Sequence, residues 1–211
     1  MAVRHLAVDW LALGSRVGAR DDVAGAGANL LGRWAEPHRA YHDLAHLEEV
    51  LARVDLLASE AADPDAVRLA AWFHDAVYDP AAGDNEERSA WLATTVLHRL
   101  QVAEPTVAEV ARLVRVTADH VVADGDSDAA VLCDADLGVL AAAADRYSSY
   151  VDGVRAEHAQ VADDDFARGR AAVLRRLLAH EPMFRTSQGR DLWEAAARRN
   201  VTAELARLET G

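Results

Sequence analysis

The segment LAAWFHDAVY, residues 69–78, is apolar enough to lie in a protein interior, yet it contains His74 and Asp75 side by side. An ionised carboxylate in such a place costs several kcal/mol unless a cation or strong hydrogen-bond donors compensate it. An imidazole beside a carboxylate in apolar surroundings is half of a divalent-metal site. Because adjacent residues on a helix diverge by about 100°, both reach one ion only if it lies in a cleft beside the helix. A buried His–Asp hydrogen bond that serves packing alone is the alternative, and the apolar flanks favour the metal site.

Apolar residues recur at spacings of three and four along nearly the whole chain, without an alternating strand pattern. Of the 211 residues, 51% are hydrophobic and only five are proline, which is typical of a mainly helical globular protein. Pro64 suits the first turn of one helix, and the acidic cluster at residues 84–87 suits the N-terminus of another. The pattern predicts helices at roughly 4–16, 21–35, 43–60, 65–78, 84–100, 105–120, 128–143, 145–160, 164–180 and 188–209.

The connections between these helices are short, and neither a Pro/Ser-rich linker nor a repeat divides the chain. A composition shift near residue 145, from apolar to more charged, marks at most a subdomain. We therefore expect one compact all-α domain spanning residues 1–211.

The formal net charge of −13 argues against nucleic acid or an anionic membrane as a partner, because binding either one needs a basic face. A small phosphorylated ligand held by a metal ion and a few arginines remains compatible with this charge. Cys133 is the single cysteine, which excludes an internal disulfide and suits a reducing cytoplasm. Residues 1–16 suit an amphipathic helix rather than a signal peptide, and no apolar run reaches the ~18 residues of a membrane span. We expect a cytoplasmic protein without a membrane partner, and a homo-oligomer stays open.

Two other regions place polar residues near apolar ones. His42 and His46 lie four apart in YHDLAH, hence on one face of a helix, although histidines at a helix start commonly cap it or face solvent. The apolar run VLCDADLGVL contains Asp134 and Asp136. The dipole of a helix N-terminus accounts for Asp134. Asp136 lies deeper and is harder to explain without a nearby cation.

Together these regions supply two imidazoles and two carboxylates from three separate helices. Such a mixed nitrogen and oxygen set suits Mn, Mg, Fe, Ni or Zn with open water positions. It differs from the thiolate-rich set of a structural zinc site. The candidate metal ligands are His46, His74, Asp75 and Asp136.

In its order of motifs the chain resembles the HD-domain metal-dependent phosphohydrolases, whose pattern is a histidine, a His-Asp doublet some thirty residues later and a distant aspartate. The segments YHDLAHL, WFHDAVYD, NEERSA, CDADLGVL, VRAEHAQV, FARGRAAVLRRLL and AAARRNVTAEL resemble a bacterial subgroup of predicted HD-superfamily hydrolases, and the match spans most of residues 28–208. The chain departs from the subgroup at His158, where tyrosine is common. The motif register favours Asp136 over Asp134 as the ligand. The resemblance implies an HD-type helical domain with a metal-site core at about 28–145, completed by C-terminal helices at 146–211.

The resemblance also implies a function: hydrolysis of a phosphate ester or anhydride of a small molecule, such as a nucleotide, by a metal-activated water. Asp75 is expected both to bind the ion and to orient this water. Glu86 or Glu87 is expected to act as a general acid or to hold a metal-bound water, unless both are ordinary acids of a helix N-terminus.

Five further residues are candidates for substrate binding. His120 suits a second ion, a substrate contact or a helix cap. Arginine suits bidentate phosphate contacts, although most arginines on charged helices are solvated. The candidates are Arg155, Arg170, Arg198 and Asn200, and the resemblance favours Arg198 with Asn200.

Two other functional classes stay open at this point. One is a binding module whose metal pocket senses a nucleotide without turnover. The other is a structural helical protein with buried His–Asp pairs and no metal. Bound metal in the purified protein separates the structural class from the rest, and phosphate release separates the enzyme from the sensor.

Overall fold

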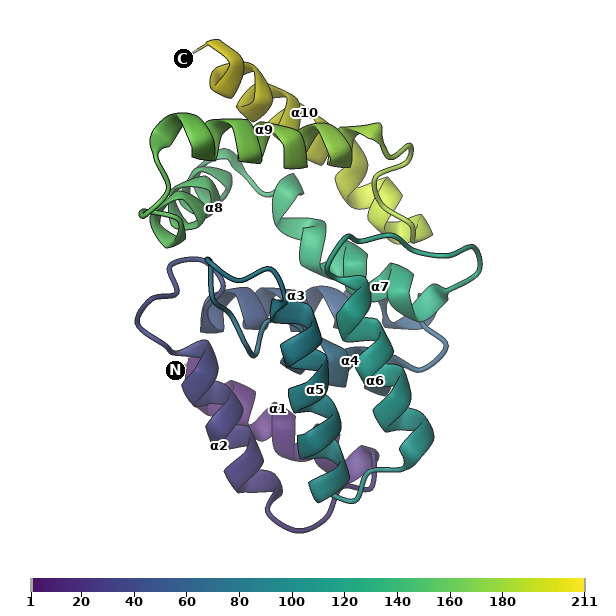
Figure 1. Cartoon of the computed structure of the whole chain (residues 1–211). Coiled ribbons are helices and arrows are strands. Elements are labelled where there is room, and N and C mark those ends of the chain that lie inside the picture. The colour runs from purple at the N-terminus through teal and green to yellow at the C-terminus, as the bar shows by residue number, and fades with distance from the viewer. Residues whose placement is uncertain (1, 211) are drawn as a thin grey trace.

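The computed structural model describes the backbone of residues 2–210 and the side chains of residues 6–210, and all regular structure in this part of the chain is helical (Figure 1). Each predicted helix is present. The elements are α1 (Ala2–Arg16), α2 (Val23–Trp34), α3 (Leu44–Leu57), η1 (Ala58–Glu60), α4 (Pro64–Phe73), α5 (Asn85–Arg99), α6 (Glu104–Val116), α7 (Ser127–Leu137), η2 (Gly138–Ala141), α8 (Ala144–Glu157), α9 (Asp163–Ala179) and α10 (Ser187–Thr210).

The helices surround two adjoining apolar cores. Helices α1–α7 form the larger bundle, and α8–α10 lie across one end of it (Figure 1). Trp193 of α10 packs against both cores and joins them. The larger core includes Trp10 and Leu13 of α1. It therefore extends closer to the N-terminus than residue 28, where the resemblance to HD-domain proteins places the start of the metal-site core. No helix in residues 2–210 is long and apolar enough to cross a lipid bilayer.

Local sequence signals start the helices that present the candidate site. The side chain of Asp43 accepts hydrogen bonds from the backbone N–H groups of Ala45 and His46, and so caps α3. Asp63 caps α4 in the same way, and Pro64 occupies its first turn as predicted. Both caps satisfy N–H groups that a helix start leaves without a partner. His46 therefore lies in the first turn of α3, and the neighbouring Asp43 fixes the backbone of that turn.

The prediction of one helix over 65–78 is wrong at its C-terminal end. Helix α4 ends at Phe73, His74 is its C-cap, and Asp75 lies in the following turn. The backbone N–H of His74 still donates to Ala70, but the chain leaves the helix there. His74 itself keeps helical backbone angles, with φ −56° and ψ −40°, so the path of the chain changes only after it. The side chains of the pair approach each other, with Asp75 Oδ2 3.2 Å from His74 Nε2.

The predicted helix over 128–143 also ends earlier, at Leu137, and continues as η2. Asp136 thus lies in the last turn of α7, while Asp134 is buried at 1% exposure between α7 and the segment before α10. The Asp134 carboxylate accepts hydrogen bonds from the backbone N–H groups of Arg185 and Thr186 and from the Thr186 hydroxyl, the last at 2.7 Å. Burial raises the pKa of Asp134, and these donors oppose that rise. Asp134 therefore ties the C-terminal helices to the larger bundle.

Replacement of Asp134 by alanine tests this role. Three donors then lose their acceptor inside the protein, and each unsatisfied donor costs roughly 1–3 kcal/mol. We expect the free energy of unfolding, measured by chemical denaturation, to fall by about 3 kcal/mol or more while the affinity for Mn²⁺ stays unchanged. A variant that keeps its stability and loses the metal would instead make Asp134 a ligand.

Candidate metal centre

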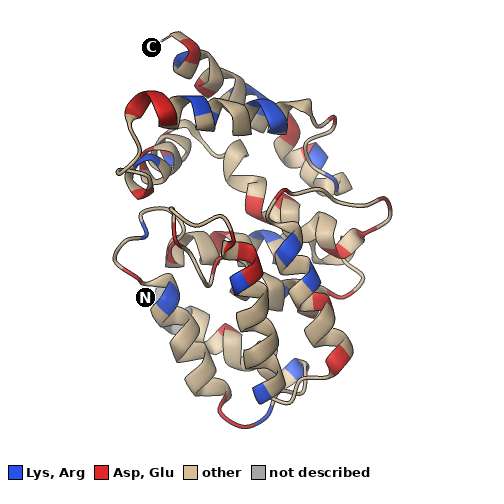
Figure 2. Ribbon diagram, in the orientation of Figure 1, with Lys and Arg blue, Asp and Glu red and all other residues tan. Residues whose placement is uncertain are grey.

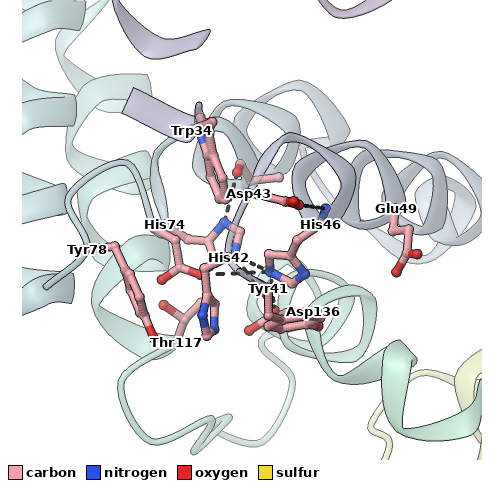
Figure 3. A network of polar contacts seen from close by, with 12 residues as sticks. Trp34, Tyr41, His42, Asp43, His46, Glu49, His74, Tyr78, Thr117 and Asp136 are labelled. Atoms are coloured by element: carbon pink, nitrogen blue, oxygen red, sulfur yellow. Dashed lines mark hydrogen bonds and ion pairs between the residues drawn. The ribbon is translucent and has the colours of Figure 1, made fainter. Parts of the chain in front are cut away.

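Three side chains from α3, α4 and α7 meet in the interior of the larger bundle (Figure 3). His46 comes from the first turn of α3, His74 from the end of α4 and Asp136 from the last turn of α7. One ligand atom from each lies within 4.8 Å of the others, an arrangement that is able to hold a metal ion. Both imidazoles are 1% exposed, and the Asp136 side chain is 16% exposed. We call these three residues the His/Asp cluster.

Asp75 adds a second carboxylate to the His/Asp cluster. The Nε2 atoms of His46 and His74 are 3.3 Å apart. Asp136 Oδ1 lies 3.2 Å from His46 Nε2 and 3.7 Å from His74 Nε2. Asp75 Oδ2 lies 3.2 Å from His74 Nε2 and 3.8 Å from His46 Nε2. All four predicted ligands thus direct polar atoms toward one region of space.

The tautomer of His74 is set by the helix that carries it. Its Nδ1 lies 2.8 Å from the carbonyl oxygen of Ala71, so Nδ1 carries the hydrogen and donates it. In the neutral ring, Nε2 then presents a lone pair to the His/Asp cluster, as metal-binding histidines do. By contrast, Nδ1 of His46 is buried and forms no hydrogen bond within residues 6–210.

The charges of the site favour a cation. Burial disfavours the ionised form of Asp136, but hydrogen bonds from His120, His46 and His74 outweigh it and hold its pKa well below the usual range. Burial likewise disfavours a charged His74, yet the neighbouring carboxylates outweigh it and raise its pKa well above the usual range. Burial lowers the pKa of His46. The two carboxylates thus favour a proton on His74, and a divalent ion fits the same donors in place of that proton.

Aromatic rings enclose the buried side of the His/Asp cluster. The Trp34 ring lies 5.4 Å from that of His74, and the Tyr41 ring lies 4.8 Å from that of His46. The guanidinium of Arg39 stacks 5.4 Å from Trp34 and donates to the carbonyl oxygen of Asp75 at 2.9 Å. These walls exclude water from one side, which strengthens electrostatic interactions within the site. Sequence reasoning missed Trp34 and Arg39, although both lie just before the YHDLAH motif.

His120 is brought to the site by an unusual backbone conformation. Its φ is +56°, in the left-handed region that histidine tolerates better than most residues. Its Nε2 lies 2.8 Å from Asp136 Oδ2, so the two oxygens of Asp136 face different imidazoles. The backbone N–H of His120 donates to the carbonyl oxygen of Val116 at 2.9 Å, so this left-handed residue also closes the turn that ends α6, as the predicted helix cap would. A second ion and a substrate contact stay predictions.

The two candidate glutamates have other surroundings. Glu87 forms a bidentate pair with Arg115 at 2.6 and 2.7 Å on the surface. Neither Glu86 nor Glu87 forms a hydrogen bond or an ion pair with the His/Asp cluster in the described part of the chain. Within the NEERSA motif, the residues that serve the site are Asn85 and Ser89. Asn85 bonds the backbone of Asp79 in both directions, and Ser89 bonds that of Val77, so both hold the loop that follows the His-Asp pair.

The predicted phosphate contacts of the C-terminal helices are engaged elsewhere. In Figure 2, basic and acidic segments alternate along α8–α10. Arg155 pairs with Asp163, Arg170 with Glu204, and Arg198 with Glu194, and Asn200 donates to two carbonyl oxygens near η2. None of these partners belongs to the His/Asp cluster, so the contacts account for the four residues structurally and lend no support to phosphate binding. Arg170 comes nearest, through Tyr150, whose ring lies 4.7 Å from Tyr41.

Sequence reasoning also missed a group of residues centred on Glu157. This carboxylate accepts the backbone N–H groups of residues 40–42 through one oxygen, and His42 Nδ1 and the Tyr78 hydroxyl through the other. Burial opposes its ionisation, but His42 and the backbone donors outweigh it and lower the pKa of Glu157 to about 2. Glu157 belongs to the motif VRAEHAQV, where it directly precedes His158.

Comparison of this chain with protein-family models, with curated proteins and with solved structures finds no match. The likeness to HD-domain hydrolases therefore rests on the order of the motifs, and the metal centre rests on its own geometry.

Replacement of Asp136 by alanine tests the metal centre. Loss of a partner that merely orients a ligand weakens metal binding 10–100-fold, so we expect loss of a ligand to weaken Mn²⁺ binding more than about 100-fold. Titration calorimetry on metal-stripped protein measures this. Asp84→Ala, which removes an exposed acid near the N-terminus of α5, is the matched control. Equal affinity in Asp136→Ala and in the control would rule the centre out.

The raised pKa of His74 predicts that metal binding releases a proton. Below its folded pKa the ring holds a proton that competes with the ion, so the apparent affinity for Mn²⁺ should rise with pH and level off above that pKa. We expect roughly one proton to be released per ion at neutral pH. Calorimetry in buffers of different ionisation enthalpy counts it. Affinity that is independent of pH between 6 and 8 would contradict this balance of charges.

Proposed function

We propose that this protein is a metal-dependent phosphohydrolase that cleaves a phosphate ester or anhydride of a small molecule such as a nucleotide. The observation that carries the proposal is the convergence of two buried imidazoles and two largely buried carboxylates, from α3, the end of α4 with its following turn, and α7. The order of the motifs, which resembles that of HD-domain hydrolases, points to the same chemistry. A divalent ion is the proposed cofactor, and a cytoplasmic location accords with the buried free thiol of Cys133.

The donor set determines what a bound ion contributes. His46, His74, Asp75 and Asp136 would hold it, and the ion would supply Lewis-acid chemistry that activates water and neutralises charge on phosphoryl oxygens. With one ligand atom from each of these four residues, a six-coordinate ion would keep positions for water and substrate.

In this proposal, Asp75 orients the attacking water and accepts its proton. Its Oδ2 faces the two imidazoles, while its Oδ1 forms no hydrogen bond within residues 6–210 and its side chain is 13% exposed. Burial disfavours the ionised form of Asp75, but His74 outweighs it and holds the pKa of Asp75 below the usual range, so the carboxylate is ionised and able to accept a hydrogen bond from that water. Asp136 is oriented by His120 through its second oxygen. The two carboxylates would therefore have different roles. Asp136 would bind the ion, and Asp75 would both bind the ion and position the water.

A metal-dependent sensor that binds a nucleotide without turnover would use the same centre. The internal pairing of the C-terminal arginines bears equally on both functions, because each of them requires a phosphorylated ligand to bind. The assay below separates the two functions.

Phosphate release from a panel of nucleotides and generic phosphate esters, with Mn²⁺, Mg²⁺, Fe²⁺, Ni²⁺ or Zn²⁺ added, tests the proposal. We expect turnover with at least one ion and none after chelation. Asp75→Asn keeps the size of the side chain and removes its charge, so kcat should fall about 10²–10⁴-fold, the usual contribution of a general base. Asp84→Asn is the matched control. Turnover by Asp75→Asn at the native rate, or metal binding without turnover by the native protein, would refute the enzymatic proposal.

A further inference from the structure

His42 lies beside the His/Asp cluster but differs from its two histidines in exposure. The residue immediately precedes the cap of α3, and its side chain is 22% exposed, whereas those of His46 and His74 are 1% exposed. Its ring stands edge-on to His46 at 5.6 Å and lies 4.3 Å from the ring of Tyr78. In Figure 3 it lies between Tyr78 and the His/Asp cluster. His42 thus borders the cluster on a side that solvent reaches.

A buried carboxylate fixes the orientation of this ring. His42 Nδ1 lies 2.7 Å from Glu157 Oε2, and the Glu157 side chain is 0% exposed. The Tyr78 hydroxyl donates to the same oxygen at 2.9 Å. The carboxylate is itself immobilised, because its Oε1 accepts the backbone N–H groups of residues 40–42 at 2.8–2.9 Å. Nδ1 therefore faces Glu157, and the opposite nitrogen faces away from it.

The ring is not needed to hold the loop in place. The three backbone hydrogen bonds to Oε1 already join residues 40–42 to α8, and they involve no side chain of the loop. Meanwhile His42 Nε2 forms no hydrogen bond in the described part of the chain. Purely structural histidines usually satisfy both ring nitrogens or bury them in apolar surroundings. The ring of His42 is fixed through Nδ1, while Nε2 has no hydrogen-bond partner in residues 6–210. This arrangement suits binding of a ligand through Nε2.

We infer that His42, through Nε2, contacts a phosphoryl oxygen of the substrate at the metal centre, and that Glu157 positions its ring for this contact. The identity of the ligand rests on the proposed function. Phosphoryl oxygens form hydrogen bonds readily, and Nε2 is the ring atom of His42 that has no hydrogen-bond partner in residues 6–210, while Nδ1 is held by Glu157. The substrate class that follows is a phosphate with a free, unesterified oxygen pointing away from the ion.

Binding of inorganic phosphate to the Mn²⁺-loaded protein tests the inference without any turnover. In His42→Asn the amide nitrogen takes the place of Nδ1 and keeps the bond to Glu157, but nothing replaces Nε2. We expect unchanged affinity for Mn²⁺ and phosphate binding that is weaker by about 10–100-fold, as for loss of a hydrogen bond to a charged group. Titration calorimetry measures both affinities.

Two further variants complete the test. Glu157→Gln keeps an acceptor for the backbone donors and removes the charge that holds the ring, so phosphate affinity should fall by a smaller factor while Mn²⁺ stays bound. His98→Asn is the matched control, because His98 forms an exposed pair with Glu104 at 2.6 Å on the surface of the larger bundle. It should change neither affinity.

Each outcome decides the matter. Equal phosphate affinity in the native protein and His42→Asn overturns the inference, as does a native Mn²⁺-loaded protein that binds no phosphate. Loss of Mn²⁺ together with phosphate in His42→Asn also overturns it, since His42 would then belong to the metal site. If phosphate binding falls as expected but no ester or nucleotide is hydrolysed, the contact stands and the hydrolase proposal fails.

Discussion

The compensation of two buried carboxylates is the constraint on which the rest of this structure depends. Asp75 and Asp136 lie largely buried among apolar residues, with side chains 13% and 16% exposed, and the imidazoles around them offset the cost of that burial. The end of α4, the cap of α3 and the last turn of α7 all place donors against these two groups. A cation is the natural complement of such a set, since it satisfies both carboxylates at once.

Buried carboxylates elsewhere in the chain have different roles because their partners differ. Asp134 and Glu157 accept backbone N–H groups, and in doing so they join the C-terminal helices to the larger bundle. Asp136 is only two residues from Asp134, yet within residues 6–210 its carboxylate contacts imidazoles and accepts no backbone N–H. The chemistry of a carboxylate in this protein is therefore decided by whether it faces a loop or the ends of α3 and α4.

The C-terminal helices contribute to the site in a way that differs from the expected one. Their arginines Arg155, Arg170 and Arg198 were expected to bind phosphate, but all three pair with acids within α9 and α10. Their contribution comes instead from Glu157, which reaches the loop before α3 and orders His42 beside the His/Asp cluster. An arginine side chain on a charged helix can reach many acidic residues, so the sequence alone does not determine its partner. A buried carboxylate such as that of Glu157 has few donors available.

Helical periodicity and the apolar flanks of its polar residues are local properties, and from them the sequence by itself determined the helical architecture and pointed to His46, His74 and Asp136 as residues that belong together. Helix ends were less certain, because they depend on one turn of backbone, and α4 stops before the pair that it was expected to carry. Only the tertiary structure decided that Asp134 joins α7 to the segment before α10, that Glu87 pairs with Arg115, and that Glu157 holds the ring of His42. Each of these depends on segments far apart in the chain, whose approach is set by packing of the two cores and leaves no trace in local periodicity.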